Sequence, residues 1–123
     1  NTTIGLALVS FIGYNVIGFD LPFLLTRSWI LGVSCPTLDI RKYGMPGVID
    51  LMMMLSHNGA KDFRKLDFWC KRLKLDVPED RTKGLDIPGL VAAGDWPLIE
   101  DHCAIDIVKT QALAARLGVG GAW

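Results

Sequence analysis

An apolar run near the start of the chain changes its period at Asp20, and this change constrains the fold more than any other feature. Residues 6–14 form an apolar run, with Val and Ile among them, which is typical of a buried strand. Over residues 21–31 apolar side chains recur at three and four positions, and Gly32 then follows as a helix C-cap. The sequence therefore predicts a strand, a turn and a helix in this order.

Asp20 is the acidic residue of this otherwise apolar stretch, and its presence there needs a physical reason. Because Pro22 follows closely, Asp20 is well suited to begin the helix as an N-cap. A carboxylate among apolar side chains is costly unless a cation or hydrogen-bond donors meet it, so a binding role is the alternative. The residues alone leave both interpretations open.

Four downstream segments predict further elements. Residues 47–56 indicate a short strand that runs into a helical turn, with Asp50 at the N-cap. Residues 62–77 place apolar and basic side chains on opposite sides of a helix, which predicts an amphipathic helix that ends before the next proline. A short helix is expected over residues 88–94, and the longest helical pattern covers residues 97–117.

Charge narrows the function classes. The 13 basic and 13 acidic side chains give a net charge of zero, so the chain lacks the basic surplus of a non-specific nucleic-acid binder. Any nucleic-acid contact has to be local. The basic residues of the amphipathic helix either lie near a phosphate backbone or form a solvated face. They are Arg64, Lys65, Lys71, Arg72 and Lys74.

Composition and length indicate the number of domains and the cellular compartment. Half of the residues are hydrophobic, and a length of 123 residues suits one domain. Three cysteines without a CxxC pair indicate neither a disulfide framework nor a zinc knuckle, which favours the reducing cytoplasm. The apolar run of residues 4–19 contains polar side chains and is shorter than the roughly 20 residues that cross a bilayer, so no membrane partner is expected.

A second acidic residue, Asp106, lies on the long C-terminal helix. Helical spacing puts it at the edge of the apolar stripe, where its carboxylate would be half buried and would need a partner. Lys109 and His102 are the candidates, three residues after it and four before it. Asp20 and Asp106 together also permit a divalent cation site, because Mg²⁺ takes carboxylate oxygens and a pair of such ions can support phosphodiester cleavage.

Two segments resemble motifs of one enzyme family. "GYNVIGFDLPFLLTRS" resembles the second motif of the DEDD 3′–5′ exonucleases in the form found in B-family DNA polymerases, with Asn15, Phe19 and Asp20 at the motif positions. "HCAIDIVKTQALAARL" resembles the third motif, with Asp106 at the metal-binding position and His102 where the family usually has Tyr. The intervening segment is similar to the predicted exonucleases related to the polymerase proofreading domain.

The resemblance implies an α/β protein with the RNase H-like exonuclease fold, in which helices flank a mixed sheet. It implies hydrolysis of single-stranded DNA, or of RNA, from the 3′ end with two Mg²⁺ or Mn²⁺ ions. Asp20 and Asp106 would be the metal ligands. Asn15 and Phe19 would lie beside the terminal nucleotide, and a core position is the alternative for Phe19.

His102 departs from the tyrosine form of the family. Other DEDD enzymes use a histidine that lies one residue further from the aspartate. A histidine with an ordinary pKa of about 6.5 can act as a general base near neutral pH more readily than a phenol with a pKa of about 10. The resemblance therefore implies that His102 is the catalytic base or orients the water. The alternative is a surface histidine paired with Asp106 or Asp101.

The first motif of the family, an Asp-x-Glu on the first strand, is missing from this sequence. Only 14 residues precede Asn15, and none of them is Asp or Glu. The resemblance therefore implies that residues 1–123 are the C-terminal part of a single 3′–5′ exonuclease domain. Its N-terminal strands would lie outside this sequence, and the chain by itself would be inactive.

Two other functions remain as alternatives. The first is a non-catalytic nucleic-acid-binding or interaction module that retains the exonuclease fold. The second is a zinc site built from side chains that lack the usual spacing of zinc ligands. Those side chains are His57, Cys70, His102 and Cys103.

Overall fold

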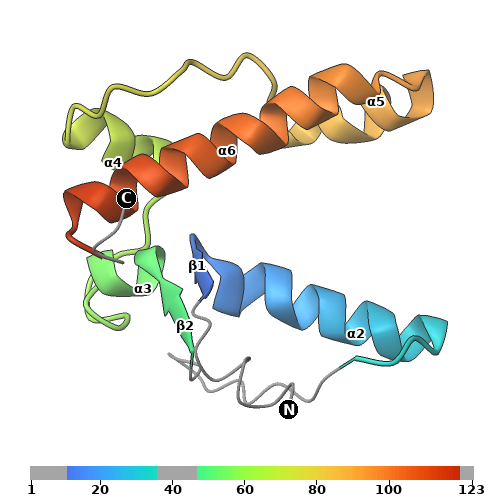
Figure 1. Ribbon diagram of the computed structural model, residues 1–123, viewed down its shortest axis with the longest axis horizontal. Helices are drawn as coiled ribbons and strands as arrows, with labels where there is room; N and C mark the ends of the chain where they lie inside the picture. Colours follow the sequence, from blue (N-terminus) through green and yellow to red (C-terminus); the bar gives the residue numbers. More distant parts are fainter. Residues whose placement is uncertain (1–10, 36–46, 120–123) are drawn as a thin grey trace, which may run out of the picture. The chain divides into compact units, whose positions relative to one another are not determined.

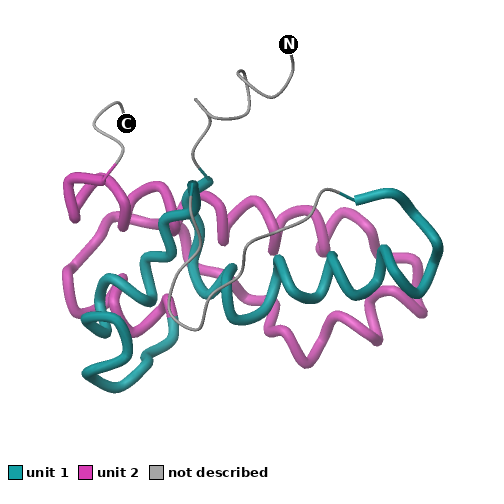
Figure 2. Tube along the Cα trace, turned by 90° about the horizontal axis from the view of Figure 1, so that it is seen from below, with its two compact units in different colours: residues 1–65 teal, residues 66–123 magenta. Residues whose placement is uncertain are grey.

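The computed structural model describes residues 11–35 and 47–119, and the chain divides into two compact units, Asn1–Lys65 and Leu66–Trp123 (Figure 2). The first unit contains β1 (Phe11–Gly13), η1 (Val16–Asp20), α2 (Leu21–Leu31), β2 (Val48–Asp50) and α3 (Leu51–Leu55). The second unit contains α4 (Leu66–Arg72), η2 (Gly84–Asp86), α5 (Ile87–Ala93) and α6 (Trp96–Arg116), as Figure 1 shows.

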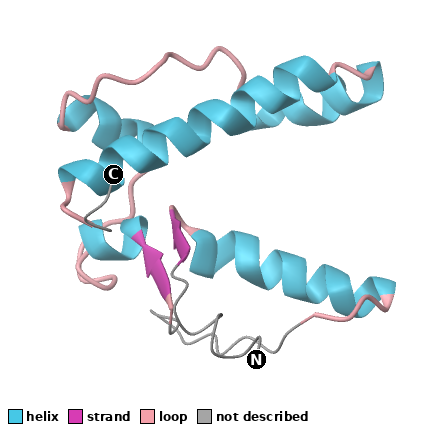
Figure 3. Ribbon diagram, viewed as in Figure 1, coloured by secondary structure: helices cyan, strands magenta, loops and turns pink. Residues whose placement is uncertain are grey.

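The sheet of the first unit is a parallel pair. β1 and β2 run in the same direction, with Phe11 opposite Val48 and Gly13 opposite Asp50 (Figure 3). The strand predicted over residues 6–14 is confirmed at Phe11–Gly13, and residues 6–10 lie outside the described residues. The fold is therefore mixed α/β, with a small parallel sheet and helices.

The carboxylate of Asp50 ties the elements of the first unit together. As predicted, it caps α3, and it accepts a hydrogen bond of 3.1 Å from the backbone N–H of Met52. It also accepts the N–H of Asn15 at 2.8 Å and the N–H of Ile17 at 3.1 Å, although the residue is only 3% exposed. These two bonds, which the sequence did not predict, join the end of β2 to the start of η1.

The entry to α2 differs from the prediction. η1 is a single π-helical turn in which the N–H of Leu21 donates to the carbonyl of Val16, five residues back. This turn leads directly into α2, so Asp20 has helical backbone angles and its side chain makes no capping hydrogen bond. Asp20 thus stands at the N-cap position of α2, as predicted, but its side chain does not cap the helix, because helical backbone already begins upstream. The predicted end of α2 at Gly32 is confirmed, since Gly32 has a φ of 67°.

α4 is shorter than the amphipathic helix predicted over residues 62–77. It ends because Lys74 takes a positive φ of 53° and the N–H of Leu75 turns back to the carbonyl of Cys70, at 2.9 Å. Phe63 precedes the helix and is half exposed. All five candidate phosphate-binding residues of this segment are exposed. The predicted helices at residues 88–94 and 97–117 are confirmed as α5 and α6.

The second unit is organised around α6. α4 packs against the C-terminal part of α6 and α5 against its N-terminal part (Figure 1). Leu113 and Ala114 of α6 are completely buried, and Cys70 of α4 is 5% exposed. No helix within the described ranges 11–35 and 47–119 has the length and apolar character required to cross a membrane.

Candidate active site

The first group of predicted site residues lies on η1. Phe19 is 60% exposed, and its ring stacks on that of Phe23 with centroids 5.9 Å apart and planes 19° from parallel. The alternative that Phe19 belongs to the core is therefore wrong. An exposed pair of stacked rings is a surface on which a nucleotide base can stack.

The backbone conformation of Asn15 and the absence of a side chain on Gly18 determine where the Asn15 amide lies. Its φ is 57°, a left-handed conformation that asparagine tolerates better than most residues, and its N–H donates to Asp50. A Cβ atom on Gly18 would lie 2.6 Å from the Oδ1 atom of Asn15. Gly18 therefore leaves the space that the Asn15 amide occupies. Gly18 was not predicted as a site residue, although a glycine between the motif residues is a signal of such close approach.

Asp20 is exposed and carries an unfavourable negative charge. Partial burial raises the pKa of its carboxyl, and the nearby negative charge of Asp50 raises that pKa further. Both effects oppose ionisation. A bound cation would offset both effects, because it favours the charged form of a carboxylate.

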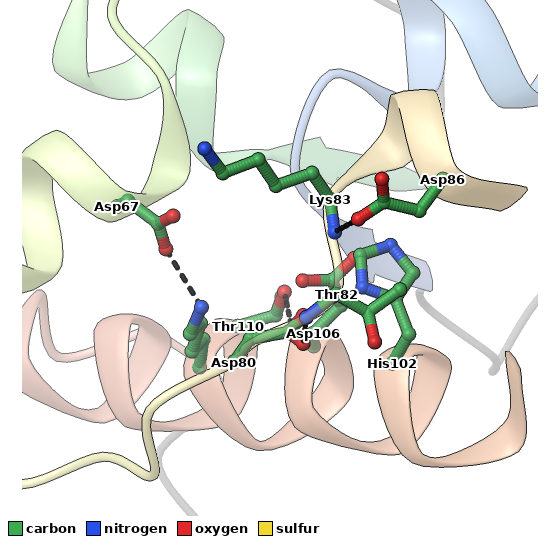
Figure 4. Close-up of polar contacts among 9 residues, drawn as sticks. Asp67, Asp80, Thr82, Lys83, Asp86, His102, Asp106 and Thr110 are labelled. Carbon is green, nitrogen blue, oxygen red and sulfur yellow. Dashed lines mark hydrogen bonds and ion pairs between the residues drawn. The ribbon is translucent and has the colours of Figure 1, made fainter. Parts of the chain in front are cut away.

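His102 in the second unit has a partner that the sequence did not predict. Its Nδ1 atom lies 2.6 Å from Oδ2 of Asp80, in the connection between α4 and η2 (Figure 4). The other oxygen of Asp80, Oδ1, accepts the N–H of Thr82 at 2.9 Å. The side chain of Asp80 is 8% exposed and that of His102 is 19% exposed. His102 is therefore held on one side by a nearly buried carboxylate.

The opposite nitrogen of His102 faces Asp106. Nε2 lies 3.8 Å from Oδ2 of Asp106, whose side chain is 52% exposed. Asp106 is thus half buried, as predicted, and His102 lies beside it, although the two groups form an ion pair only when the ring is protonated. Lys109, the other candidate partner, donates its hydrogen bond to Asp67 instead, at 2.7 Å, and interacts with Asp106 through charge alone. Asp101 is not the partner of the histidine either, since Asp80 occupies that role.

Lys109 is a buried cation at the same face of α6. Its residue is 5% exposed. Burial lowers the pKa of its ammonium group. The hydrogen bond and the negative charge of Asp67 outweigh this effect, and the charges of Asp80 and Asp106 add to them, so the pKa is raised overall. Lys109 therefore stays charged. It also lines a pocket of about 370 Å³, together with Asp80 of the α4–η2 connection.

Asp20 and Asp106 belong to different units, so their convergence on one metal pair stays a prediction. Among residues 11–35 and 47–119, no group of three or more His, Cys, Asp or Glu side chains has an arrangement that could hold a metal ion. Cys35, Cys70 and Cys103 are free thiols, with Cys70 buried. The zinc alternative gains no support from these positions.

Residues 3–119 match a family described as predicted 3′–5′ exonucleases related to the exonuclease domain of PolB. The chain belongs to this family. The resemblance seen in the sequence is thereby confirmed over nearly the whole chain. An uncharacterized protein of Methanocaldococcus jannaschii is 36% identical over 93 residues, which are 74% of this chain and 47% of that protein. The chain thus spans about half the length of this curated relative. No solved structure matches the chain.

In this member of the PolB-related exonuclease family, each motif segment forms a local structure of its own. The segment like the second motif forms η1 and most of α2, and the segment like the third motif lies on α6. Asn15, Phe19 and Asp20 are thus brought together within one unit. His102 and Asp106 are brought together within the other, along with Asp80, which belongs to neither motif.

Proposed function

We propose that this chain is part of a metal-dependent 3′–5′ exonuclease that removes nucleotides from the 3′ end of single-stranded DNA. The observation that carries the proposal is the family match over residues 3–119, which includes both segments with candidate catalytic carboxylates. The RNase H-like fold, and the place of residues 1–123 as the C-terminal part of one such domain, belong to the same proposal. The missing first-motif carboxylates would come from outside this sequence.

The residues present suit a hard divalent cation. Asp20 offers an exposed carboxylate whose negative charge is disfavoured by its surroundings, and Asp106 offers a half-exposed one. Mg²⁺ and Mn²⁺ take such oxygen ligands, whereas the free thiols and imidazoles of this chain would suit softer ions. In the proposal Asp20 and Asp106 hold two such ions. When bound, the ions would stabilise the charge that develops on the attacking and leaving oxygens.

His102 supplies the proton chemistry in this proposal. Its Nε2 atom faces Asp106 at 3.8 Å, which is too long for a direct hydrogen bond and short enough for one water molecule to contact both groups. His102 takes a proton from the water as its oxygen attacks the terminal phosphorus. The bond between that phosphorus and the 3′ oxygen of the preceding nucleotide breaks, and this oxygen takes up a proton from solvent. The products are a nucleoside monophosphate and a strand with a new 3′ hydroxyl group.

Phe19 and Asn15 hold the terminal nucleotide in the same proposal. The Phe19–Phe23 pair gives a base an exposed aromatic face. The Asn15 amide, which lies against Gly18, gives a hydrogen-bonding group one helical turn away. Such contacts are independent of base identity, so the proposal predicts shortening of strands of any sequence.

The test is an assay of the full-length protein on a 5′-labelled single-stranded oligodeoxynucleotide with Mg²⁺ or Mn²⁺. The expected result is a ladder of products shortened from the 3′ end, which stops when EDTA is added. A strand with a terminal 3′ phosphorothioate linkage should resist the first step. The same sequence as RNA and as a blunt duplex establishes the preferred substrate.

Two outcomes would contradict the proposal in different ways. Binding of the single strand without shortening would favour the alternative, a non-catalytic nucleic-acid-binding module that retains the exonuclease fold. If the protein neither binds nor shortens the single strand, both functions are rejected. Shortening that continues in EDTA would reject the metal dependence.

A further inference from the structure

The contact between Asp80 and His102 links two parts of the second unit that are far apart in the sequence. Asp80 lies in the irregular connection between α4 and η2, and His102 lies 22 residues later on α6. Their Oδ2 and Nδ1 atoms are 2.6 Å apart, which is short for a hydrogen bond with nitrogen. Figure 4 shows the Asp80 carboxylate and the His102 ring meeting above α6. Neither the family motifs nor the helical spacing predicted this pair.

Asp80 is itself held in one orientation. Its Oδ1 atom accepts the N–H of Thr82 at 2.9 Å, so the carboxylate is fixed at both oxygens. The side chain is 8% exposed. A hydrogen bond is stronger in surroundings with little water, and a carboxylate anchored in this way cannot turn away from the ring. The position of the His102 ring therefore depends on Asp80.

The contact also determines which ring nitrogen carries the proton. An ionised carboxylate can only accept hydrogen bonds, so Nδ1 of His102 must be the donor. In the neutral ring the other nitrogen, Nε2, then has a free lone pair. That nitrogen is the one that lies 3.8 Å from Asp106. Asp80 thus turns the accepting nitrogen of the histidine toward the half-exposed carboxylate.

We propose that Asp80 is a positioning residue that fixes the ring orientation and tautomer of His102, so that the Nε2 lone pair faces Asp106. A carboxylate behind a working histidine commonly has this effect, both on metal-bound histidines and on histidine bases. As a statement about catalysis, the inference rests on the exonuclease function proposed above. As a statement about the tautomer, it can be tested without any turnover.

The substitution Asp80→Asn tests whether Asp80 sets the tautomer of His102 or only holds the connection against α6. The side chain keeps its shape, and the fixed N–H of Thr82 claims the amide oxygen. The amide nitrogen then faces Nδ1 of His102 and donates to it. The ring must give up its Nδ1 proton and carry a proton on Nε2 instead. The hydrogen bond remains, but the tautomer is reversed.

The first measurement is ¹⁵N–¹H correlation spectroscopy of the histidine rings in the full-length protein at a pH where the rings are neutral. The His102 signals are assigned by their loss in His102→Gln. Wild type is expected to carry the proton on Nδ1, and Asp80→Asn to carry it on Nε2. Asp101→Asn removes the same charge next to His102 in the sequence and should leave the tautomer unchanged. A wild-type ring protonated on Nε2 would overturn the inference.

The second measurement is the steady-state rate of strand shortening. Asp80→Asn is expected to lower kcat by about 10²-fold with little change in KM, within the range that general base catalysis supplies. In a His102→Ala background the same substitution should have no further effect, because Asp80 acts through His102. Equal losses in both backgrounds, or a wild-type kcat in Asp80→Asn, would overturn the positioning role.

These outcomes distinguish the inference from the function on which it rests. A wild type that carries the Nδ1 proton but shortens no strand would reject the exonuclease proposal and support the tautomer assignment. An active wild type whose tautomer reverses in Asp80→Asn without loss of rate would retain the exonuclease proposal and reject the positioning role.

Discussion

Asp106→Asn is expected to lower the rate of strand shortening by the full-length protein by about 10³-fold or more. The substitution keeps the shape of the side chain and removes the negative charge, and a lost metal ion removes several kcal/mol of transition-state stabilisation. The rate is measured on a 5′-labelled single strand with saturating Mg²⁺. Asp101→Asn is the matched control, because Asp101 is an exposed aspartate on the same helix, and its rate should match wild type.

The same assay tests whether Asp20 and Asp106 share one metal site. If they do, Asp20→Asn should be about as costly as Asp106→Asn, and the double variant should be no worse than either single one, because residues that act as a unit are not additive. Losses that multiply in the double variant would show that the two carboxylates act independently. Ordinary turnover by Asp106→Asn would remove Asp106 from the metal site altogether.

Asp50→Ala is expected to destabilise the chain by about 3 kcal/mol or more. The carboxylate accepts the N–H groups of Asn15, Ile17 and Met52, and its residue is 3% exposed. Removing it loses a helix cap worth about 1 kcal/mol and leaves two further N–H groups unpaired, each at roughly 1–3 kcal/mol. Chemical denaturation followed by circular dichroism measures the loss. Asp62→Ala, an exposed aspartate of the same unit, should change stability by less than about 0.5 kcal/mol.

Amide hydrogen exchange gives this prediction a local readout. The three N–H groups should be protected in wild type and should lose protection together in Asp50→Asn, a variant that retains part of the bonding and is more certain to fold. A stability of Asp50→Ala within about 1 kcal/mol of wild type would mean that water can replace the carboxylate, contrary to its burial.

The helix ends show what a sequence can and cannot predict. α2 and α5 end at Gly32 and Gly94, with φ of 67° and 71°, and both ends were predicted because a positive φ favours glycine. α4 ends with the same geometry at Lys74, where φ is 53°. Lysine has no preference for that conformation, so nothing in the residues 62–77 marked the end of the helix.

The contacts of the candidate site likewise include some that the sequence predicted and some that it did not. His102 and Asp106 were predicted as neighbours because four residues make one turn of a helix, and a turn is local geometry. Asp80 was missed because its contact depends on the path of an irregular connection, which has no periodicity to interpret. The π-helical turn at η1 was missed for a related reason, since an apolar run ending at Asp20 fits an N-cap as well as a continuous helix.

Hydrogen bonds tie the connection between α4 and η2 to α6 and to the start of η2. The carbonyl of Leu73 accepts from Arg116, Asp80 meets His102, and the N–H of Lys83 donates to Asp86. Between these points the backbone has no regular hydrogen-bonding, so it can open at a lower free energy than the helices that it joins. Opening would release the histidine ring while α4, α5 and α6 stay folded. The stability of the His102 site to heat or denaturant is therefore set by the least stable segment in contact with it. A melting temperature measured on the helices would overestimate the stability of this site.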